Sequence, residues 1–465
     1  MRSLLKIFFS VFLIGLWIYT PVFPLQVITN KGSCTFTKSV TINYLVIDGN
    51  ISQTAAMYDW CNGSGTPVDP YRIENLTIDG LFTYTCVKIW NVWAHLRVKN
   101  CTIRRSSDYG VLLFNVTNGI LENNSIQSNN GDGISLASKT DGIQIINNTI
   151  ANNGDCGIEW ALDLENITIL ANRFQNNSGA GIASISDSQW IIIQNNTIYD
   201  NEDGINAGTW GNCTIWNNTI FNNVNHGIFG HISEGVIANN TIFSNRIGIK
   251  NGAAYDCIIA NNSVYSNNEF GIYSSLVVNF TISDNIIYDH NKWGLTLRDA
   301  FNCTLFRNYI YNGINYGIYI YDSDNNSIIG NVLTSNYAGI LLGFTGNSTI
   351  LNNTIVNGLW GIYFIYADNN TIDGNNISNN QEYGIWLTYS RNTTIINNNL
   401  IGNLLGIYLD GDCRGTVIEN NTIQDRPPES NILDIIIIVI SVIAAGAIAI
   451  WALRIHRRRR HIALN

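Results

Sequence analysis

A short motif recurs along most of this chain at a nearly constant spacing. Residues 237–245 read IANNTIFSN, and residues 215–223 read IWNNTIFNN. The second Asn of the motif, or its equivalent, falls at positions 124, 148, 172, 196, 218, 240, 262, 285, 308, 331, 353, 375, 398 and 421. The spacing is 22 to 24 residues throughout. A fixed period of this size is typical of stacked repeat units rather than of a closed domain.

Three short β-like runs recur within each period. One is Gly-Ile-x-x, as in GIYI (317–320), the second precedes the motif, as in NCTIW (212–216), and the third is the Thr-Ile of NNTI itself. Turn residues separate the runs, and no helical pattern of 10–15 residues fits between them. The sequence therefore predicts an all-β parallel β-helix of about 15 coils over residues 72–424. Its aliphatic residues face the interior, and its length is roughly 70 Å.

The asparagines of the motif have a structural and a chemical interpretation. In stacked coils identical turn positions lie above one another, so their side-chain amides can hydrogen-bond as a ladder. Asn also tolerates the left-handed backbone of a tight turn. Each Asn-Xaa-Thr is in addition a glycosylation sequon. We expect ladder sites such as Asn240 to be unmodified, and outer-turn sites such as Asn347 and Asn392 to be the better candidates for glycans.

Both ends of the chain carry membrane signals. Residues 1–25 place Arg2 and Lys6 around the start of an apolar run, the layout of a signal peptide or an uncleaved N-terminal anchor. Residues 433–453 are apolar over a length that spans a bilayer as a transmembrane helix. By the positive-inside rule the basic tail, residues 454–465, is expected in the cytoplasm.

Between these ends we expect a single-pass ectodomain that is extracellular or periplasmic. Residues 26–71 are less regular and are expected to form an N-terminal cap and first coil, while residues 425–432 form a short linker. Residues 26–430 contain 18 basic and 33 acidic residues, which argues against nucleic acid as a partner. The membrane is the expected partner at the C-terminus.

Nine cysteines lie outside the expected membrane segments. Cys213, Cys257 and Cys303 occupy one slot of the repeat, two coils apart, and a separation of ~9–10 Å is too long for a disulfide. We expect them to be small buried core residues. A Cys34–Cys61 bridge in the cap is an open alternative for the irregular N-terminal part.

The recurring GI-x(~9)-NxTI-x-x-NNTI-xxN pattern resembles the right-handed parallel β-helix proteins of the NosD-like and pectate-lyase-like kind, as found on archaeal and bacterial surfaces. The resemblance covers roughly residues 72–424 and implies a right-handed helix. This fold hosts polysaccharide lyases, glycosidases, adhesins and copper-site accessory proteins. The expected ectodomain holds Met57 and four scattered histidines, with no cluster at ligand spacing: His95, His226, His231 and His290. A copper-accessory role is therefore the least favoured, and no metal site is predicted.

A column of carboxylates falls in the turn after the Gly-Ile run. Its best local constellation is Arg298, Asp299, Asp322 and Asp324, on adjacent coils. Paired carboxylates could serve acid/base hydrolysis or bind Ca²⁺. Asp is also a preferred turn residue, so one Asp per coil is expected from the turns alone, without a catalytic role. We keep these four residues as catalytic candidates, with no cofactor expected other than a possible Ca²⁺.

Aromatic residues follow the Gly-Ile run in the C-terminal half. If the Ile after Gly points inward, strand alternation turns the next residue outward. That places a stripe of rings on the surface, formed by Tyr273, Tyr319, Tyr363, Trp386 and Tyr408. Such a surface suits stacking on sugar rings, although aromatics also favour strands for structural reasons alone.

The sequence therefore predicts a membrane-anchored surface protein that binds carbohydrate or another cell-envelope polymer without catalysis. Two alternatives stay open. One is a polysaccharide lyase or glycosidase acting on the Gly-Ile face, and the other is a structural or adhesin rod.

Overall fold

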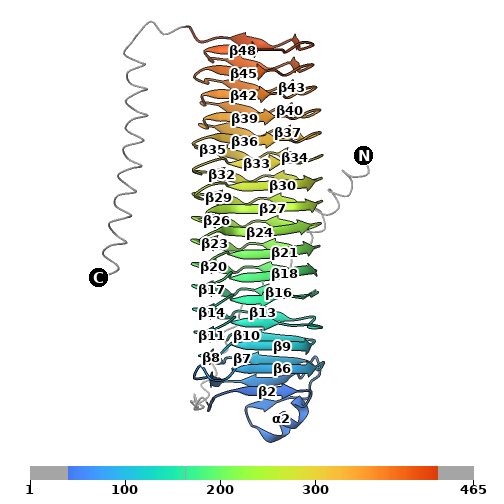
Figure 1. Cartoon of the computed structure of the whole chain (residues 1–465), viewed down its shortest axis with the longest axis vertical. Coiled ribbons are helices and arrows are strands. Elements are labelled where there is room, and N and C mark those ends of the chain that lie inside the picture. The colour runs from blue at the N-terminus through green and yellow to red at the C-terminus, as the bar shows by residue number, and fades with distance from the viewer. Residues whose placement is uncertain (1–39, 163, 428–465) are drawn as a thin grey trace, which may run out of the picture. The chain divides into compact units, whose positions relative to one another are not determined.

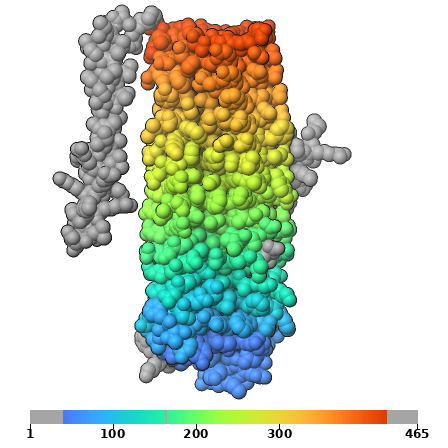
Figure 2. Space-filling view, in the orientation of Figure 1, coloured from blue at the N-terminus to red at the C-terminus, as the bar shows by residue number. Residues whose placement is uncertain are grey.

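The computed structural model describes residues 40–162 and 164–427. Within these residues the chain winds through coils that stack on one another in chain order, as the run of colour from blue to red shows (Figures 1 and 2). Each regular coil gives one strand to each of three sheets, which we name A, B and C. Sheets A and C have 17 strands each and sheet B has 16. The predicted parallel β-helix is confirmed.

Sheet A contains the Thr-Ile of each NNTI motif. Its strands are β1 (Val40–Ile42), β5 (Leu76–Asp79), β8 (Thr102–Arg104), β11 (Ser125–Gln127), β14 (Thr149–Ala151), β17 (Arg173–Gln175), β20 (Thr197–Tyr199), β23 (Thr219–Phe221), β26 (Thr241–Phe243), β29 (Ser263–Tyr265), β32 (Ile286–Tyr288), β35 (Tyr309–Tyr311), β38 (Val332–Thr334), β41 (Thr354–Val356), β44 (Asn376–Ser378), β47 (Asn399–Ile401) and β50 (Thr422–Gln424).

Sheet B contains the Gly-Ile runs and has the most variable strands. They are β2 (Leu45–Asp48), β6 (Val87–Val92), β9 (Val111–Val116), β12 (Ile134–Leu136), β15 (Ile158–Trp160), β18 (Ile182–Gln189), β21 (Ile205–Gly211), β24 (His226–Ser233), β27 (Ile247–Tyr255), β30 (Ile272–Val278), β33 (Leu295–Arg298), β36 (Tyr316–Tyr321), β39 (Ala338–Gly343), β42 (Trp360–Ile365), β45 (Tyr383–Thr388) and β48 (Leu405–Asp410).

Sheet C contains the run that precedes the motif. Its strands are β3 (Cys61–Asn62), β4 (Tyr71–Glu74), β7 (Leu96–Lys99), β10 (Gly119–Glu122), β13 (Gln144–Ile146), β16 (Thr168–Leu170), β19 (Ile192–Gln194), β22 (Thr214–Trp216), β25 (Val236–Ala238), β28 (Ile258–Ala260), β31 (Thr281–Ser283), β34 (Thr304–Phe306), β37 (Ser327–Ile329), β40 (Thr349–Leu351), β43 (Thr371–Asp373), β46 (Thr394–Ile396) and β49 (Val417–Glu419).

The corner between sheets C and A is built by the second Asn of the motif. Asn239 takes the left-handed backbone, with φ of 56°, and this turns the Asn240 side chain into the interior. The Asn240 amide nitrogen donates to Asn262 Oδ1 (3.0 Å) and to the carbonyl of Ile215 (2.9 Å). Its Oδ1 accepts from the backbone and side-chain nitrogens of Asn218. The same side-chain link joins every consecutive pair from Asn124 to Asn421, so the predicted ladder is confirmed.

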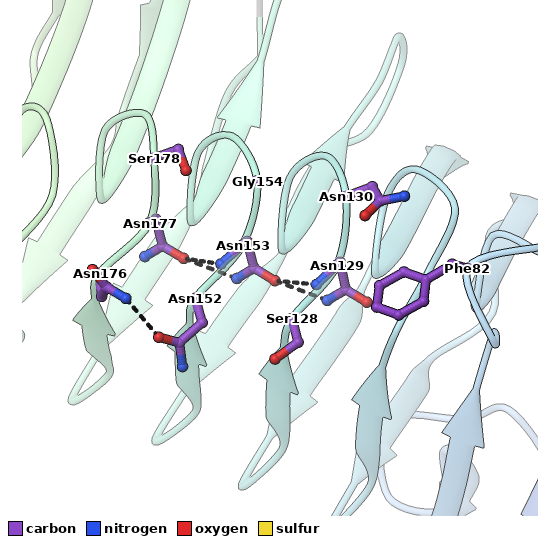
Figure 3. A pocket seen from close by; sticks show the side chains of 10 residues that line it. All are labelled: Phe82, Ser128, Asn129, Asn130, Asn152, Asn153, Gly154, Asn176, Asn177 and Ser178. Carbon is purple, nitrogen blue, oxygen red and sulfur yellow. Dashed lines mark hydrogen bonds between the residues drawn. The ribbon is translucent and has the colours of Figure 1, made fainter.

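A second Asn ladder lines the corner between sheets A and B. Figure 3 shows three of its members, Asn129, Asn153 and Asn177, where each side-chain amide donates to the Oδ1 of the next at 2.9 Å. The ladder continues to Asn267. His290 takes the next slot, where Nδ1 accepts from the backbone of Asn267 and Nε2 donates to the carbonyl of Val264. Burial lowers the pKa of His290 to about 4, so the ring stays neutral.

The two ends of the described stack differ. At the first coil, helix α2 (Ile51–Met57) and the antiparallel pair β3–β4 cover the core. At the last coil, Ile418 and Ile423 are 43% and 46% exposed, although their register partners Ile395 and Leu400 are fully buried. The core is therefore open at the C-terminal end of the described chain.

Several expectations concern residues that the structure does not describe. The signal or anchor (1–25), the transmembrane span (433–453), the basic tail (454–465) and Cys34 lie outside the described residues. Within the described coils and connections, no helix combines the length and the apolarity needed to cross a membrane. Cys213, Cys257 and Cys303 are buried and unpaired, as predicted.

Asn240→Ala tests the energetic role of the corner ladder. The substitution removes the acceptor of the buried Asn218 backbone nitrogen and the side-chain donor to the Ile215 carbonyl, and each buried polar group left unsatisfied costs about 1–3 kcal/mol. We expect a loss of roughly 3 kcal/mol or more, measured as a lower midpoint of urea unfolding followed by circular dichroism. The control is Thr241→Ala on the outward side of β26, expected to lose less than about 1 kcal/mol. Equal losses for the two variants would contradict a ladder-dependent stack.

Candidate functional site

The outward face of sheet B carries the predicted ring stripe. On β42, Ile362 and Phe364 are buried in the core while Tyr363 between them is partly exposed. Tyr363, Trp386 and Tyr408 are register partners on three successive coils. The five predicted rings all point outward, so their predicted orientation is confirmed.

These rings gather into two clusters with the residue that precedes each Gly-Ile. We call them together the aromatic belt. The first cluster is Phe270, Tyr273, Trp293, Tyr316 and Tyr319, and the second is Trp360, Tyr363, Tyr383, Trp386 and Tyr408. Within the clusters ring centroids lie 4.3 to 6.3 Å apart, and most ring pairs are tilted or edge-on. Leu341, which is buried, occupies the row between them.

Sheet A carries aromatic residues in a different geometry. Tyr199, Phe221, Phe243, Tyr265, Tyr288 and Tyr311 stack in one column with centroids 4.7 to 4.9 Å apart and ring planes within 10° of parallel. Each ring face there is covered by the next ring, so only edges meet solvent. In the belt, Trp360 meets Trp386 at 76° and Trp293 meets Tyr319 at 50°. Such tilts leave parts of the ring faces free of ring neighbours.

Two buried polar groups within the belt lack partners among the described residues. Thr296 lies between Tyr273 and Tyr319 in register, is 1% exposed, and its hydroxyl makes no hydrogen bond there. The indole nitrogen of Trp386 is likewise buried without an acceptor. Buried polar groups in folded proteins are usually hydrogen-bonded, so both sites have hydrogen-bonding capacity that the described coils do not use.

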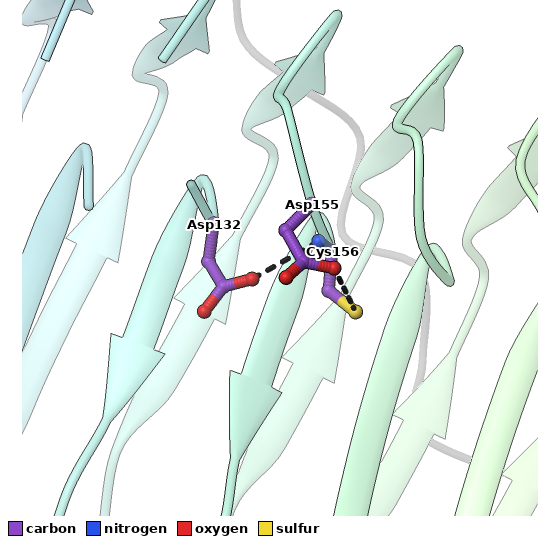
Figure 4. Close-up of side chains that lie close together, drawn as sticks. All are labelled: Asp132, Asp155 and Cys156. Carbon is purple, nitrogen blue, oxygen red and sulfur yellow. Dashed lines mark hydrogen bonds between the residues drawn. The ribbon is translucent and has the colours of Figure 1, made fainter. Parts of the chain in front are cut away.

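The N-terminal half of the same face holds a cluster of acids. The ligand atoms of Asp132, Asp155 and Cys156 lie within 4.8 Å of one another (Figure 4). The Cys156 backbone nitrogen donates to Asp132 Oδ1 at 3.0 Å, and the Asp132 carboxyl is hydrogen-bonded to Glu159. Burial, and then the charge of Glu159, raise the pKa of Asp132 to about 8. Two carboxylates and a thiol could hold a cation, although Ca²⁺ prefers oxygen ligands alone.

A groove of about 450 Å³ adjoins this cluster. Trp90, Tyr109 and Phe114 contribute aromatic side chains to its lining, and Glu159 contributes a carboxylate. The remaining lining residues are Leu112, Ser135, Leu136, Ala137, Trp160, Ala161 and Leu162. An aromatic lining with a few polar groups is typical of small-ligand sites.

The histidines of this face already have protein partners. His226 Nδ1 lies 2.8 Å from Asp203 Oδ1, and its backbone nitrogen donates to the same oxygen at 2.9 Å. His231 Nδ1 is hydrogen-bonded to the carbonyl of Gly252. These contacts account for the polar atoms concerned without a metal.

The predicted catalytic constellation lies at the exposed corner between sheets B and C. Asp299 and Asp322 both take the left-handed backbone, with φ of 49° and 48°, as turn residues do. Arg298 lies 3.5 Å from Asp299 in an exposed ion pair, and Asp324 accepts from the backbone of Gly346. Arg298, Asp299 and Asp324 thus have structural partners at the turns, and the catalytic role of all four residues stays a prediction.

The sequon candidates have the expected placement. Asn347 and Asn392 are exposed in the corner that follows sheet B, whereas Asn240 is buried in the ladder. Glycosylation of the two exposed sites stays a prediction.

Asp132 and Glu159 were missed as site residues from the sequence. Asp132 immediately precedes a Gly-Ile run, in the slot that Asp203, His226 and Phe270 fill on other coils. A polar residue in this slot was the available signal. Gly133 then allows the close corner, since a Cβ there would lie 2.6 Å from the Gly157 carbonyl.

Comparison with known proteins identifies the family. The family model described as right handed beta helix region matches residues 28–189, 85–233 and 183–333. The chain belongs to this right-handed β-helix family. A second model, described as periplasmic copper-binding protein (NosD), matches residues 302–427 of this β-helix protein. No curated protein sequence matches the chain.

Several solved structures are similar to this right-handed β-helix protein. The A-module of the Azotobacter vinelandii mannuronan C-5 epimerase AlgE6 is 14% identical with a TM-score of 0.45, over 72% of this chain and 92% of that one. The AlgE4 A-module of the same organism is 16% identical with a TM-score of 0.45, over 69% and 90%. An alginate lyase from Paenibacillus sp. str. FPU-7 is 12% identical with a TM-score of 0.36, over 62% and 99%.

Asp132→Asn tests the buried acid. The folded protein keeps the Asp132 proton up to a pH of about 8, whereas an unfolded Asp loses it near pH 4. Stability is therefore lost as the pH rises from about 4 to about 8. The Asn side chain keeps an oxygen that can accept from the Cys156 backbone nitrogen, and it has no carboxyl group that could ionise. We expect its melting temperature, relative to the wild type, to be higher at pH 8 than at pH 5.

The control for this titration is Glu165→Gln, at an exposed carboxyl on the B-to-C corner. Its melting temperature relative to the wild type should not change with pH. A pH-independent difference for Asp132→Asn would show that Asp132 ionises normally.

Proposed function

We propose that this protein binds an extended carbohydrate or other cell-envelope polymer along the outward face of sheet B, without cleaving it. The observation that carries the proposal is the tilted, partly exposed geometry of the aromatic belt. Sugar rings stack through their C–H faces on aromatic faces, and tilted rings offer such faces where a stacked column does not. The belt extends from the coil of Phe270 to that of Tyr408, which suits a chain-like ligand rather than a small molecule.

The carboxyl geometry favours binding over hydrolysis. Glycosidases hold two carboxyl groups on either side of the scissile bond, about 5–5.5 Å apart in retaining and about 6.5–9.5 Å apart in inverting enzymes. Asp132 instead accepts from the Cys156 backbone nitrogen, and the nearby Glu159 charge helps to keep it protonated, an arrangement that stabilises a buried acid. Cleavage by the Arg298, Asp299, Asp322 and Asp324 group is the second candidate, and release of reducing ends or unsaturated products would reveal it.

The proposed location is the outer side of a membrane. The N-terminal segment is expected to direct export, and residues 433–453 are expected to anchor the solenoid on a linker of a few residues. The periplasmic description of the NosD model supports an exported solenoid. A copper role has less support, because residues 302–427 contain no His or Met, the thiol of Cys303 is buried, and Cys413 is the one other soft ligand of this range.

Trp386→Ala tests the belt. The affinity of the full chain in detergent for neutral, amino and acidic polysaccharides is measured by affinity electrophoresis in gels containing laminarin, glycol chitosan or alginate. For the polysaccharide that retards the wild type, loss of one stacked ring should reduce affinity up to about tenfold. Trp386→Phe, which keeps a ring, should retain most of it.

The matched control is Phe243→Ala in the stacked column of sheet A. This variant also loses an outward ring between two aromatic neighbours, and it should lower the melting temperature without changing retardation. If Phe243→Ala and Trp386→Ala weaken binding equally, or if no polysaccharide retards the wild type, the belt does not bind carbohydrate.

A further inference from the structure

The groove beside Asp132 has a charge that the described residues do not neutralise. Four carboxylates surround Tyr109 and together raise its pKa: Asp108 has the largest effect, followed after burial by Asp132, Glu159 and Asp155. Ion pairs elsewhere in the described chain join acids such as Asp79, Glu269 and Asp412 to arginine or lysine, but none involves these four. The region around the groove is therefore acidic, although Asp132 itself keeps its proton up to a pH of about 8.

The nearest basic side chains on the same face do not change this. Lys88 is the register partner of Leu112 in the groove lining, and Lys139 is an exposed corner residue after β12. Among the described residues, no ion pair joins either lysine to the four acids. Glu159, the acid that lines the groove, therefore has no basic partner there and can meet a cation from outside the chain.

The aromatic lining favours the same kind of ligand. Trp90, Tyr109 and Phe114 all contribute to the groove, and a cation is attracted to the faces of such rings. The ring planes of Trp90 and Phe114 are inclined at 63° to each other, so neither ring covers the face of the other. A ligand that carries a positive charge beside an apolar surface would contact both these rings and the Glu159 carboxylate.

We propose that the Trp90–Glu159 groove binds the protonated amino group of an amino sugar within the polymer that lies on sheet B. This inference rests on the proposed function and specifies its substrate class. The ammonium group lies between the Glu159 carboxylate and the aromatic rings. Polyuronates are disfavoured, because their carboxylates would meet an acidic groove with no basic partner among the described residues.

The groove and the belt lie on one face in register. The outward column runs from Glu159 through Ala183, Asn206, Phe229 and Lys250 to Tyr273. Five strand spacings of ~4.8 Å separate the groove from the first cluster of the belt, a distance of about 24 Å. A single extended polymer can therefore occupy both.

Two oligosaccharides that differ only in charge test the proposal. Chitosan hexasaccharide carries free amines, and chitin hexasaccharide has the same backbone with every amine acetylated. We expect isothermal titration calorimetry of the full chain in detergent, at about pH 6 and low salt, to give about tenfold tighter binding of the chitosan hexamer. Salt should weaken this preference, because exposed charges are screened.

Glu159→Gln removes the charge from the groove while keeping its shape. It should abolish the preference for the chitosan hexamer over the chitin hexamer. The matched control is Asp187→Asn, an exposed acid on the same sheet outside the groove, which should keep the preference. Trp90→Leu serves as a second variant if Glu159→Gln lowers the melting temperature, and it should reduce the binding of both oligosaccharides.

Several outcomes would overturn the proposal. Equal binding of the two oligosaccharides, or equal competition by an alginate hexamer, would show that the amine is not recognised. Loss of the preference on adding EDTA would show that the acids hold a metal ion. Equal competition by a lysine hexapeptide would point to a basic protein partner. If these results occur while Trp386→Ala still weakens polysaccharide binding, only the amino-sugar inference fails, whereas absence of any polysaccharide binding removes both.

Discussion

The side-chain hydrogen bond from one asparagine to the next is the interaction on which this solenoid depends. Each ladder amide donates along the stack and to a backbone carbonyl of the coil before, so it links coils and closes a corner at the same time. The first ladder precedes the sheet A strands from β11 to β50, and the second follows those from β11 to β29, so much of sheet A is held at both ends and its strands hardly vary in length. Sheet B has no comparable restraint at its far end, and its strands vary from three residues in β12 to nine in β27. The variable sheet is the one that carries the candidate sites.

The two aromatic surfaces show how one residue type serves two purposes. On sheet A the strands are short and in uniform register, so outward rings fall directly above one another and stack face to face. On sheet B rings come from two positions of each strand, before the Gly and after the Ile. The two rows interleave and force tilts, as at Trp360 and Trp386. The first arrangement adds stability to the stack, and the second leaves ring faces available to a ligand.

Much of the fold was predictable from the sequence, because residues at the same position of each repeat lie above one another in the stack. The spacing of the NNTI motif predicted the length of one coil. The position of Asn240 within the motif predicted a corner, and the residue after each Gly-Ile predicted the outward column of rings. The second ladder was present in the motif as its final Asn but has no β-branched residue beside it to mark it. The Asp132–Glu159 pair could not be found in this way, because the two side chains meet across coils and Asp132 looks like an ordinary turn residue. Ring tilt and the unpartnered Thr296 hydroxyl depend on neighbouring side chains, which the period does not specify.

The open last coil has a consequence for how such a repeat protein can lengthen during evolution. Ile418 and Ile423 end the core ladders without a successor in the described residues, and Asn421 ends the first Asn ladder. A duplicated unit of 22 to 24 residues inserted at any corner would find the same amide below it and offer the same amide above it. Gene duplication could therefore lengthen the ligand track one row at a time, with no redesign of the existing rows. The length of the stack would then be an inherited count of repeats.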